Sequence, residues 1–96
     1  MRFRLIISVR AAADVDRLEG WLLDKNPAAA LKVAPLLFTA FDGLTRMPER
    51  TRQLIGETHE LQVPFGGSGY VIRYEVSDRE VIVTRVFHAL EDRSRR

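Results

Sequence analysis

Apolar and polar residues alternate over residues 2–9. The odd positions from Phe3 to Val9 are all apolar, whereas the even positions include arginine and serine. Successive side chains of a strand point to opposite faces, so this pattern predicts an N-terminal strand with one strongly apolar face.

The spacing changes to three and four residues over residues 11–25, where Val15, Leu18, Trp21 and Leu22 share one face. This spacing predicts an amphipathic helix. We expect Trp21 to lie in the core of a helix hairpin, and not to serve as a binding platform.

The first helix is predicted to end at Asn26-Pro27, because asparagine caps a helix and proline suits its first position. Asp14 and Asp16 lie near its start, where the helix dipole favours anions. A second helix is predicted over 27–47, bent by an internal proline. Its predicted buried stripe consists of Leu31, Ala34, Phe38, Phe41 and Leu44–Thr45.

The second half of the chain reads as β structure. Alternation predicts strands over 59–65, 70–76 and 81–88, after a loop over 48–57. Short connections make these strands an antiparallel meander. The expected fold is therefore α+β, one domain over 1–96: an N-terminal strand, an antiparallel helix hairpin and a three-stranded antiparallel meander, with the helices packed on one face of the sheet.

Composition excludes several kinds of chemistry. The chain has 96 residues and no cysteine, and its two histidines lie far apart, so we expect neither a metal nor a cofactor. The apolar run Leu5–Ile7 is too short for a signal peptide, and no apolar run is long enough to span a membrane. We expect a cytoplasmic protein without membrane contact.

Arginine dominates the cations. Fifteen residues are Lys or Arg, and only Lys25 and Lys32 are lysines. The guanidinium group suits carboxylates and phosphates, and the net charge of +2 favours an acidic partner. The arginines that we expect to bind a partner, rather than to stay solvated, are Arg46, Arg50, Arg52, Arg93 and Arg95.

The segment 58–92 carries the clearest motifs. It contains Glu60-Leu61, then Phe65-Gly66, then Ser68-Gly69-Tyr70, and its last strand ends at His88. In this order and spacing the segment resembles the C-terminal half of the RelE/ParE toxins, although His59 stands where those proteins carry arginine. A strand follows the glycines, so they predict a hairpin loop and not a phosphate cradle.

The N-terminal half also resembles this family, through its Ala/Asp-rich first helix, Asn26-Pro27 and Met47-Pro48-Glu49. The resemblance implies a toxin of a type II toxin–antitoxin pair, held by a cognate antitoxin as its protein partner. It also implies one of two targets. ParE-like members inhibit DNA gyrase, and RelE-like members cut mRNA in the ribosome.

Two departures favour the gyrase-directed interpretation. Val71 stands where RelE-like proteins carry an arginine, and Ala89-Leu90 replaces a basic pair. Arg73, Arg85 and His88 would have to substitute as catalytic groups if the chain were a ribonuclease. His88 has a structural alternative, in which it closes the sheet by a hydrogen bond. An inactive relative that retains antitoxin binding is the third alternative.

Overall fold

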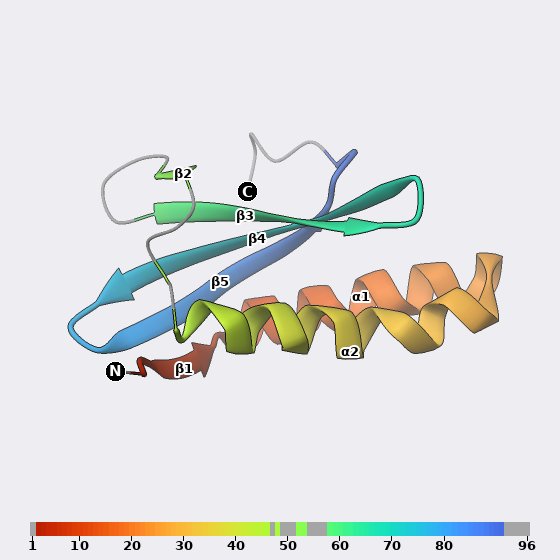
Figure 1. The fold of residues 1–96 in the computed structure, drawn as a ribbon. Coiled ribbons are helices and arrows are strands. Elements are labelled where there is room, and N and C mark those ends of the chain that lie inside the picture. Colours follow the sequence, from red (N-terminus) through yellow and green to blue (C-terminus); the bar gives the residue numbers. More distant parts are fainter. Residues whose placement is uncertain (1, 47, 49–51, 54–57, 92–96) are drawn as a thin grey trace.

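The computed structural model describes residues 2–46, 48, 52–53 and 58–91 (Figure 1). Two helices follow a short first strand, and the remaining strands complete the chain. The elements are β1 (Arg4–Ile7), α1 (Val9–Lys25), α2 (Pro27–Leu44), β2 (Arg52–Gln53), β3 (Thr58–Phe65), β4 (Ser68–Ser77) and β5 (Glu80–His88).

One mixed sheet carries the strands in the order β1-β5-β4-β3-β2. The β3–β4–β5 part is antiparallel, β1 joins β5 in parallel, and the helix hairpin packs on one face (Figure 1). The predicted meander and layering are therefore confirmed. The predicted loop over 48–57 is wrong at Arg52–Gln53, which pairs with β3 opposite Glu60 and His59. A two-residue strand is too short to show any alternation.

The first strand is shorter than predicted because Ser8 starts the helix. Its hydroxyl accepts a hydrogen bond from the Ala11 amide at 3.0 Å, the geometry of a helix N-cap. Val9 therefore belongs to α1 and is 87% exposed, although the alternation placed it on the apolar strand face. Asn26 closes α1 through its amide and caps α2 through its side chain, as predicted.

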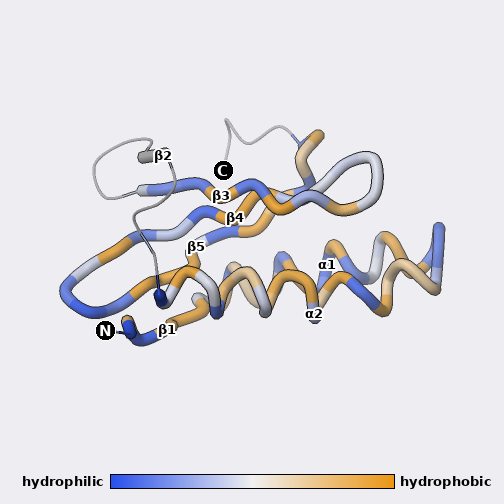
Figure 2. Tube along the Cα trace, viewed as in Figure 1, coloured by the Kyte–Doolittle hydropathy of each residue, from blue (hydrophilic) through white to orange (hydrophobic). Residues whose placement is uncertain are grey.

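The stripe predicted for the second helix is confirmed at its C-terminal end, where Phe41, Leu44 and Thr45 are buried, and is wrong further towards the N-terminus. Leu31 and Phe38 were expected in the core, yet they are 76% and 47% exposed. Most residues along α2 are apolar (Figure 2), so spacing alone could not select the buried face. The buried face consists of Ala30, Val33, Leu37, Phe41 and Leu44.

This apolar character also changes what the sequence suggested about membrane spans. By length and composition alone, α2 would suffice to cross a membrane, contrary to expectation. However, Leu37, Phe41 and Leu44 are fully buried against the domain. The inner face of α2 thus belongs to the core of a folded domain.

A two-residue turn at Gly66-Gly67 joins β3 to β4, because Phe65 pairs with Ser68. Gly66 has a positive φ of 60°, a conformation that favours glycine. The predicted hairpin loop is therefore confirmed. Gly69 lies close to the neighbouring strand, and a Cβ there would stand 2.5 Å from a backbone oxygen.

The side chains of Ser8, the N-cap of α1, and of Asp14 within α1 cap the edge of β5 where β1 ends. In the part of the chain that the structure describes, no strand continues the pairing beyond Ile7, which would leave backbone groups of β5 unpaired. The Ser8 hydroxyl instead donates to the Thr84 carbonyl at 3.1 Å, and the Asp14 carboxylate accepts from the Val86 amide at 2.8 Å. Helix α1 thus replaces the missing length of strand.

Candidate functional site

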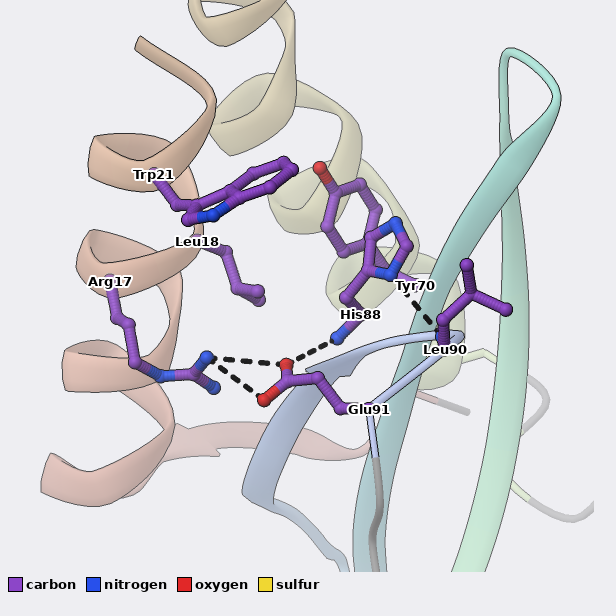
Figure 3. A pocket seen from close by; sticks show the side chains of 7 residues that line it. All are labelled: Arg17, Leu18, Trp21, Tyr70, His88, Leu90 and Glu91. Carbon is purple, nitrogen blue, oxygen red and sulfur yellow. Dashed lines mark hydrogen bonds and ion pairs between the residues drawn. The ribbon is translucent and has the colours of Figure 1, made fainter. Parts of the chain in front are cut away.

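A cleft of about 510 Å³ lies between α1 and the adjoining ends of β4 and β5 (Figure 3). Its interior is mainly apolar, and charged groups stand at its rim. Arg17, Leu18 and Trp21 form the helix wall, and Tyr70, His88, Leu90 and Glu91 form the opposite wall. An open apolar cleft with a few polar groups is the usual form of a binding site.

Trp21 lies in this cleft and not in the core of the hairpin, so the prediction for this residue is wrong. It is 60% exposed, and its ring centroid lies 6.5 Å from that of His88. Val15 and Leu18 of the same predicted face are buried, whereas Trp21, one turn further along α1, lines the cleft. Leu90 lines the opposite wall of the cleft and is 84% exposed.

His88 closes the turn that follows β5. Its Nδ1 accepts a hydrogen bond from the Leu90 amide at 3.2 Å, so the neutral ring carries its proton on Nε2. Nε2 lies 3.3 Å from the Ser68 hydroxyl, to which it can donate. Both ring nitrogens therefore have partners within the domain, as in the structural alternative for this residue.

Tyr70 forms the floor of the cleft. It is 4% exposed, and its ring meets that of His88 edge to face at 5.7 Å. Burial raises the pKa of the Tyr70 hydroxyl above its ordinary value of 10.0, so the phenol stays neutral over the physiological pH range. Tyr70 and Tyr74 are both buried, as expected for core residues.

An ion pair between Arg17 and Glu91 forms the rim. The guanidinium of Arg17 donates to both carboxylate oxygens, at 3.2 and 3.0 Å (Figure 3). One of these oxygens also accepts from the His88 amide at 2.8 Å. Glu91 thus joins the end of β5 to α1 at the rim of the cleft.

The opposite face of the sheet carries two arginines that lie side by side. Arg73 and Arg85 pair across β4 and β5, with their guanidinium carbons 5.3 and 4.7 Å from the ring centroid of Phe87. Each is matched by a carboxylate. Arg73 donates to Glu60 at 3.0 Å, and Arg85 donates to Asp14 at 2.8 and 3.0 Å.

His88 does not join these arginines. Val86 belongs to the core beneath the helices, and alternation along β5 puts His88 on that same side. Arg85 and Phe87 point to the other side. Of the three residues considered for catalysis, Arg73 and Arg85 lie next to each other on one face of the sheet. His88 lies in the cleft on the opposite face.

The arginines considered for partner binding are described only in part. Arg46 is exposed and forms an ion pair with Asp42 at 3.1 Å. The backbone of Arg52 lies in β2, and its side chain is outside the described residues, as are Arg50, Arg93 and Arg95. Among the described residues, no three potential metal-ligating side chains lie together.

Sequence reasoning missed the cleft itself. Leu90 had one usable signal, because an apolar residue follows the last strand just before the acidic pair 91–92. Arg17 and Glu91 gave no such signal. Their contact joins positions 74 residues apart, and no local sequence pattern predicts it.

Comparison with known proteins identifies the family. The model of the ParE toxin of the type II toxin–antitoxin system parDE matches residues 5–93, nearly the whole chain. The chain belongs to the ParE toxin family. It is thus the toxin component of a type II toxin–antitoxin system, as its motifs indicated.

Relatives and solved structures agree with this assignment. Toxin RelE1 of Caulobacter vibrioides is 46% identical over 97% of this chain and 100% of its own length. Toxin RelE3 of the same organism is 34% identical, over 88% of this chain and 91% of its own length.

Two solved structures share the fold. The chromosomal ParDE system of P. aeruginosa superposes with a TM-score of 0.76 at 16% identity, over 92% of this chain and 97% of that one. The RelBE2 toxin–antitoxin complex of Mycobacterium tuberculosis gives 0.62 at 22% identity, over 92% and 99%. The fold of this toxin is therefore that of the RelE/ParE toxins.

Proposed function

We propose that this toxin arrests growth by binding a protein target, DNA gyrase, in the bacterial cytoplasm, and that it does not cut RNA. The separation of Arg73 and Arg85 from His88 supports this proposal. RNA cleavage without a metal needs a base, an acid and a cation around one phosphate. In this toxin Arg73 and Arg85 lie on the other face of the sheet from His88, and the cation on the side of His88, Arg17, is already paired with Glu91.

Charge neutralisation supports the same proposal. Arg85 is nearly buried and bonded to Asp14, which also accepts from the Val86 amide. A phosphate at Arg85 would have to displace that carboxylate and leave the Val86 amide without its partner. The loss of a buried hydrogen bond of this kind costs about 1–3 kcal/mol.

The test is to induce the toxin in bacteria and to follow gyrase and mRNA in the same cells. We expect growth arrest, loss of supercoiling in a reporter plasmid, and intact transcripts. Purified toxin should block supercoiling by purified gyrase. Translation-dependent cuts in mRNA, with supercoiling unchanged, would establish the ribonuclease instead. Growth without arrest, at a toxin level verified by immunoblot, would establish an inactive relative.

His88→Gln and Arg73→Gln separate these outcomes further. The gyrase proposal expects both variants to arrest growth like the parent chain, provided that each still folds. A ribonuclease that used these groups would lose at least about 100-fold in cleavage, the usual effect of removing a general acid or base. Loss of arrest in both variants with folding intact would contradict our proposal.

We propose further that the cognate antitoxin lays an amphipathic helix in the cleft. Trp21 and Leu90 supply exposed apolar surface on its two sides, and Arg17 supplies positive charge at the rim. A helix docks in such a groove through apolar residues spaced three and four apart. An acidic residue beside this stripe would compete with Glu91 for the guanidinium of Arg17.

Leu90→Asp tests this docking site because Leu90 is so exposed that its replacement leaves the core intact. We expect at least a tenfold weaker affinity for the antitoxin, since a buried apolar anchor would be lost. Leu23→Asp is the matched control, because Leu23 is 52% exposed on α1 but does not line the cleft. Equal affinities for the two variants would place the antitoxin elsewhere.

A further inference from the structure

The floor of the cleft contains a polar group that the domain itself does not satisfy. Tyr70 is only 4% exposed, and its ring centroid lies 5.7 Å from that of Phe65 and 5.7 Å from that of His88. Its hydroxyl has no hydrogen-bond partner among the residues that the structure describes. In Figure 3 this hydroxyl lies on the Trp21 side of the cleft, away from the ion pair at the rim. Buried hydroxyls nearly always have a partner, so we expect the occupant of the cleft to supply one.

A docked helix changes the surroundings of this hydroxyl. In the free toxin the cleft is open, and solvent can hydrogen-bond to the group. A helix in the cleft excludes that solvent. If the side chain above Tyr70 were apolar, the hydroxyl would be buried without a partner, which opposes binding. Burial is also the only cause that raises the pKa of Tyr70, so the phenol stays protonated and acts as a hydrogen-bond donor.

A positive charge lies at the same end of the cleft. Arg17, Trp21 and Lys25 follow one another at four-residue spacing, which places them along one face of α1. The Lys25 ammonium stands 5.4 Å from the centroid of the Trp21 ring. It forms no ion pair within the described part of the chain, and adjacent helix positions such as Asp24 do not share its face. Because Arg17 is already paired with Glu91, an anion near Lys25 displaces no partner whereas one at Arg17 does.

We propose that the antitoxin helix carries an acidic residue within its apolar stripe, and that its carboxylate accepts a hydrogen bond from the Tyr70 hydroxyl close to Lys25. This inference rests on the proposed docking of that helix in the cleft. A hydrogen bond from a phenol to a carboxylate is charge-assisted and about twice as strong as one between neutral groups. The apolar residues on either side of the acid cover Trp21 and Leu90.

Tyr70 thereby makes the cleft selective. A helix with the same apolar stripe but no acceptor at this position leaves the hydroxyl unpaired, and a site built around a buried hydrogen bond rejects such a ligand. The toxin therefore distinguishes its antitoxin from other amphipathic helices by one polar contact on the floor of the cleft.

Tyr70→Phe tests this contact because it removes the hydroxyl and leaves the ring. Titration calorimetry of the full-length toxin with the antitoxin encoded beside it should show at least a tenfold weaker affinity. Tyr74→Phe is the matched control, since Tyr74 is equally buried but does not line the cleft, and its affinity should equal that of the parent. Circular dichroism of both variants verifies that they fold.

The charge of the partner is tested from both sides of the contact. Lys25→Gln should weaken binding and make it less sensitive to salt, whereas Lys32→Gln, exposed on α2, should do neither. Each acidic residue of the antitoxin is then replaced by its amide. One replacement should weaken binding to the parent toxin but have little further effect on Tyr70→Phe, as in a double-mutant cycle of two groups in contact.

The outcomes separate this inference from the docking on which it rests. Unchanged or tighter binding by Tyr70→Phe, with Leu90→Asp weakened, would overturn the inference and leave the docking site in place. Affinities unchanged in both variants would overturn both. Coupling of Tyr70 to a neutral antitoxin residue, and to none of its acids, would also overturn the proposed carboxylate.

Discussion

The carboxylate of Asp14 on α1 accepts two hydrogen bonds from the guanidinium of Arg85 on β5, at 2.8 and 3.0 Å. A third comes from the Val86 amide at 2.8 Å. Asp14 is only 5% exposed. One carboxylate thus joins the helix layer to the sheet and also provides a hydrogen-bond partner for a backbone amide at the edge of β5.

Asp14→Ala should lower the free energy of unfolding by about 3 kcal/mol, because it leaves both Arg85 and a buried amide without their partner. Urea unfolding monitored by circular dichroism measures this loss. Asp16→Ala on the exposed side of the same helix is the control, with an expected change below about 0.5 kcal/mol. Equal losses in both variants would show that the network contributes nothing.

The stability should also fall in acid. Burial by itself raises the pKa of Asp14, but the bonds from Arg85 and Val86 and the charge of Arg85 outweigh it, so the pKa lies below its ordinary 3.8. The folded chain therefore holds this carboxylate ionised where the unfolded chain has begun to bind protons. The stabilisation is complete above about pH 4 and is lost as the pH falls through the folded pKa.

Urea unfolding of the parent chain and Asp14→Asn at several pH values measures this effect. The difference in the free energy of unfolding between the two should be constant from about pH 6 to 8 and should shrink below about pH 4. A difference that does not change with pH would mean that Asp14 has the same pKa in both states.

Gly69→Ala should destabilise the β3–β4 hairpin, because the added Cβ would stand 2.5 Å from the Val63 carbonyl oxygen, which belongs to the backbone and cannot move aside. We expect a loss of about 2–4 kcal/mol, which thermal unfolding would record as a lower Tm. Gly67→Ala, two residues away, meets nothing within 4 Å and should change the Tm little. A Tm of Gly69→Ala equal to the parent value would show that the hairpin can open at this point.

Trp21 is the only tryptophan, so its fluorescence reports on the cleft. Because its ring is 60% exposed, occupation by an apolar helix should shift the emission to shorter wavelength. Trp21→Ala should cost less than about 1 kcal/mol of stability, well below the roughly 3–5 kcal/mol of a buried tryptophan. Emission unchanged by saturating antitoxin would exclude the cleft as its site.

The sequence predicted the parts of the fold that depend on local periodicity. Alternation located β3, β4 and β5, and Asn26-Pro27 located the break between the helices. The prediction from the sequence was wrong where the periodicity was ambiguous. Because most residues of α2 are apolar, their spacing did not show which face of the helix is buried. The strand β1 ends before Ser8, which caps α1, although the alternation continues to Val9.

The site could be predicted less well, because contacts between distant residues form it. Arg17 meets Glu91 and Asp14 meets Arg85 across more than 70 positions, and no local pattern distinguishes these charges from solvated ones. The sequence did contain the departures at Val71 and Ala89-Leu90, which pointed away from a phosphate site. The position of Trp21 depends on the cleft that α1 forms with Tyr70 and His88, which are distant in the sequence.

The parallel pairing of β1 with β5 sets an order of events in folding. Leu5 meets Val81, so the first strand has no place in the sheet until the last one exists. Contacts this distant in sequence close slowly, whereas the helix hairpin and the β3–β4 hairpin can form from neighbouring residues alone. During synthesis the toxin therefore remains incomplete, with the sheet-facing surface of α1 unsatisfied, until β5 has emerged from the ribosome.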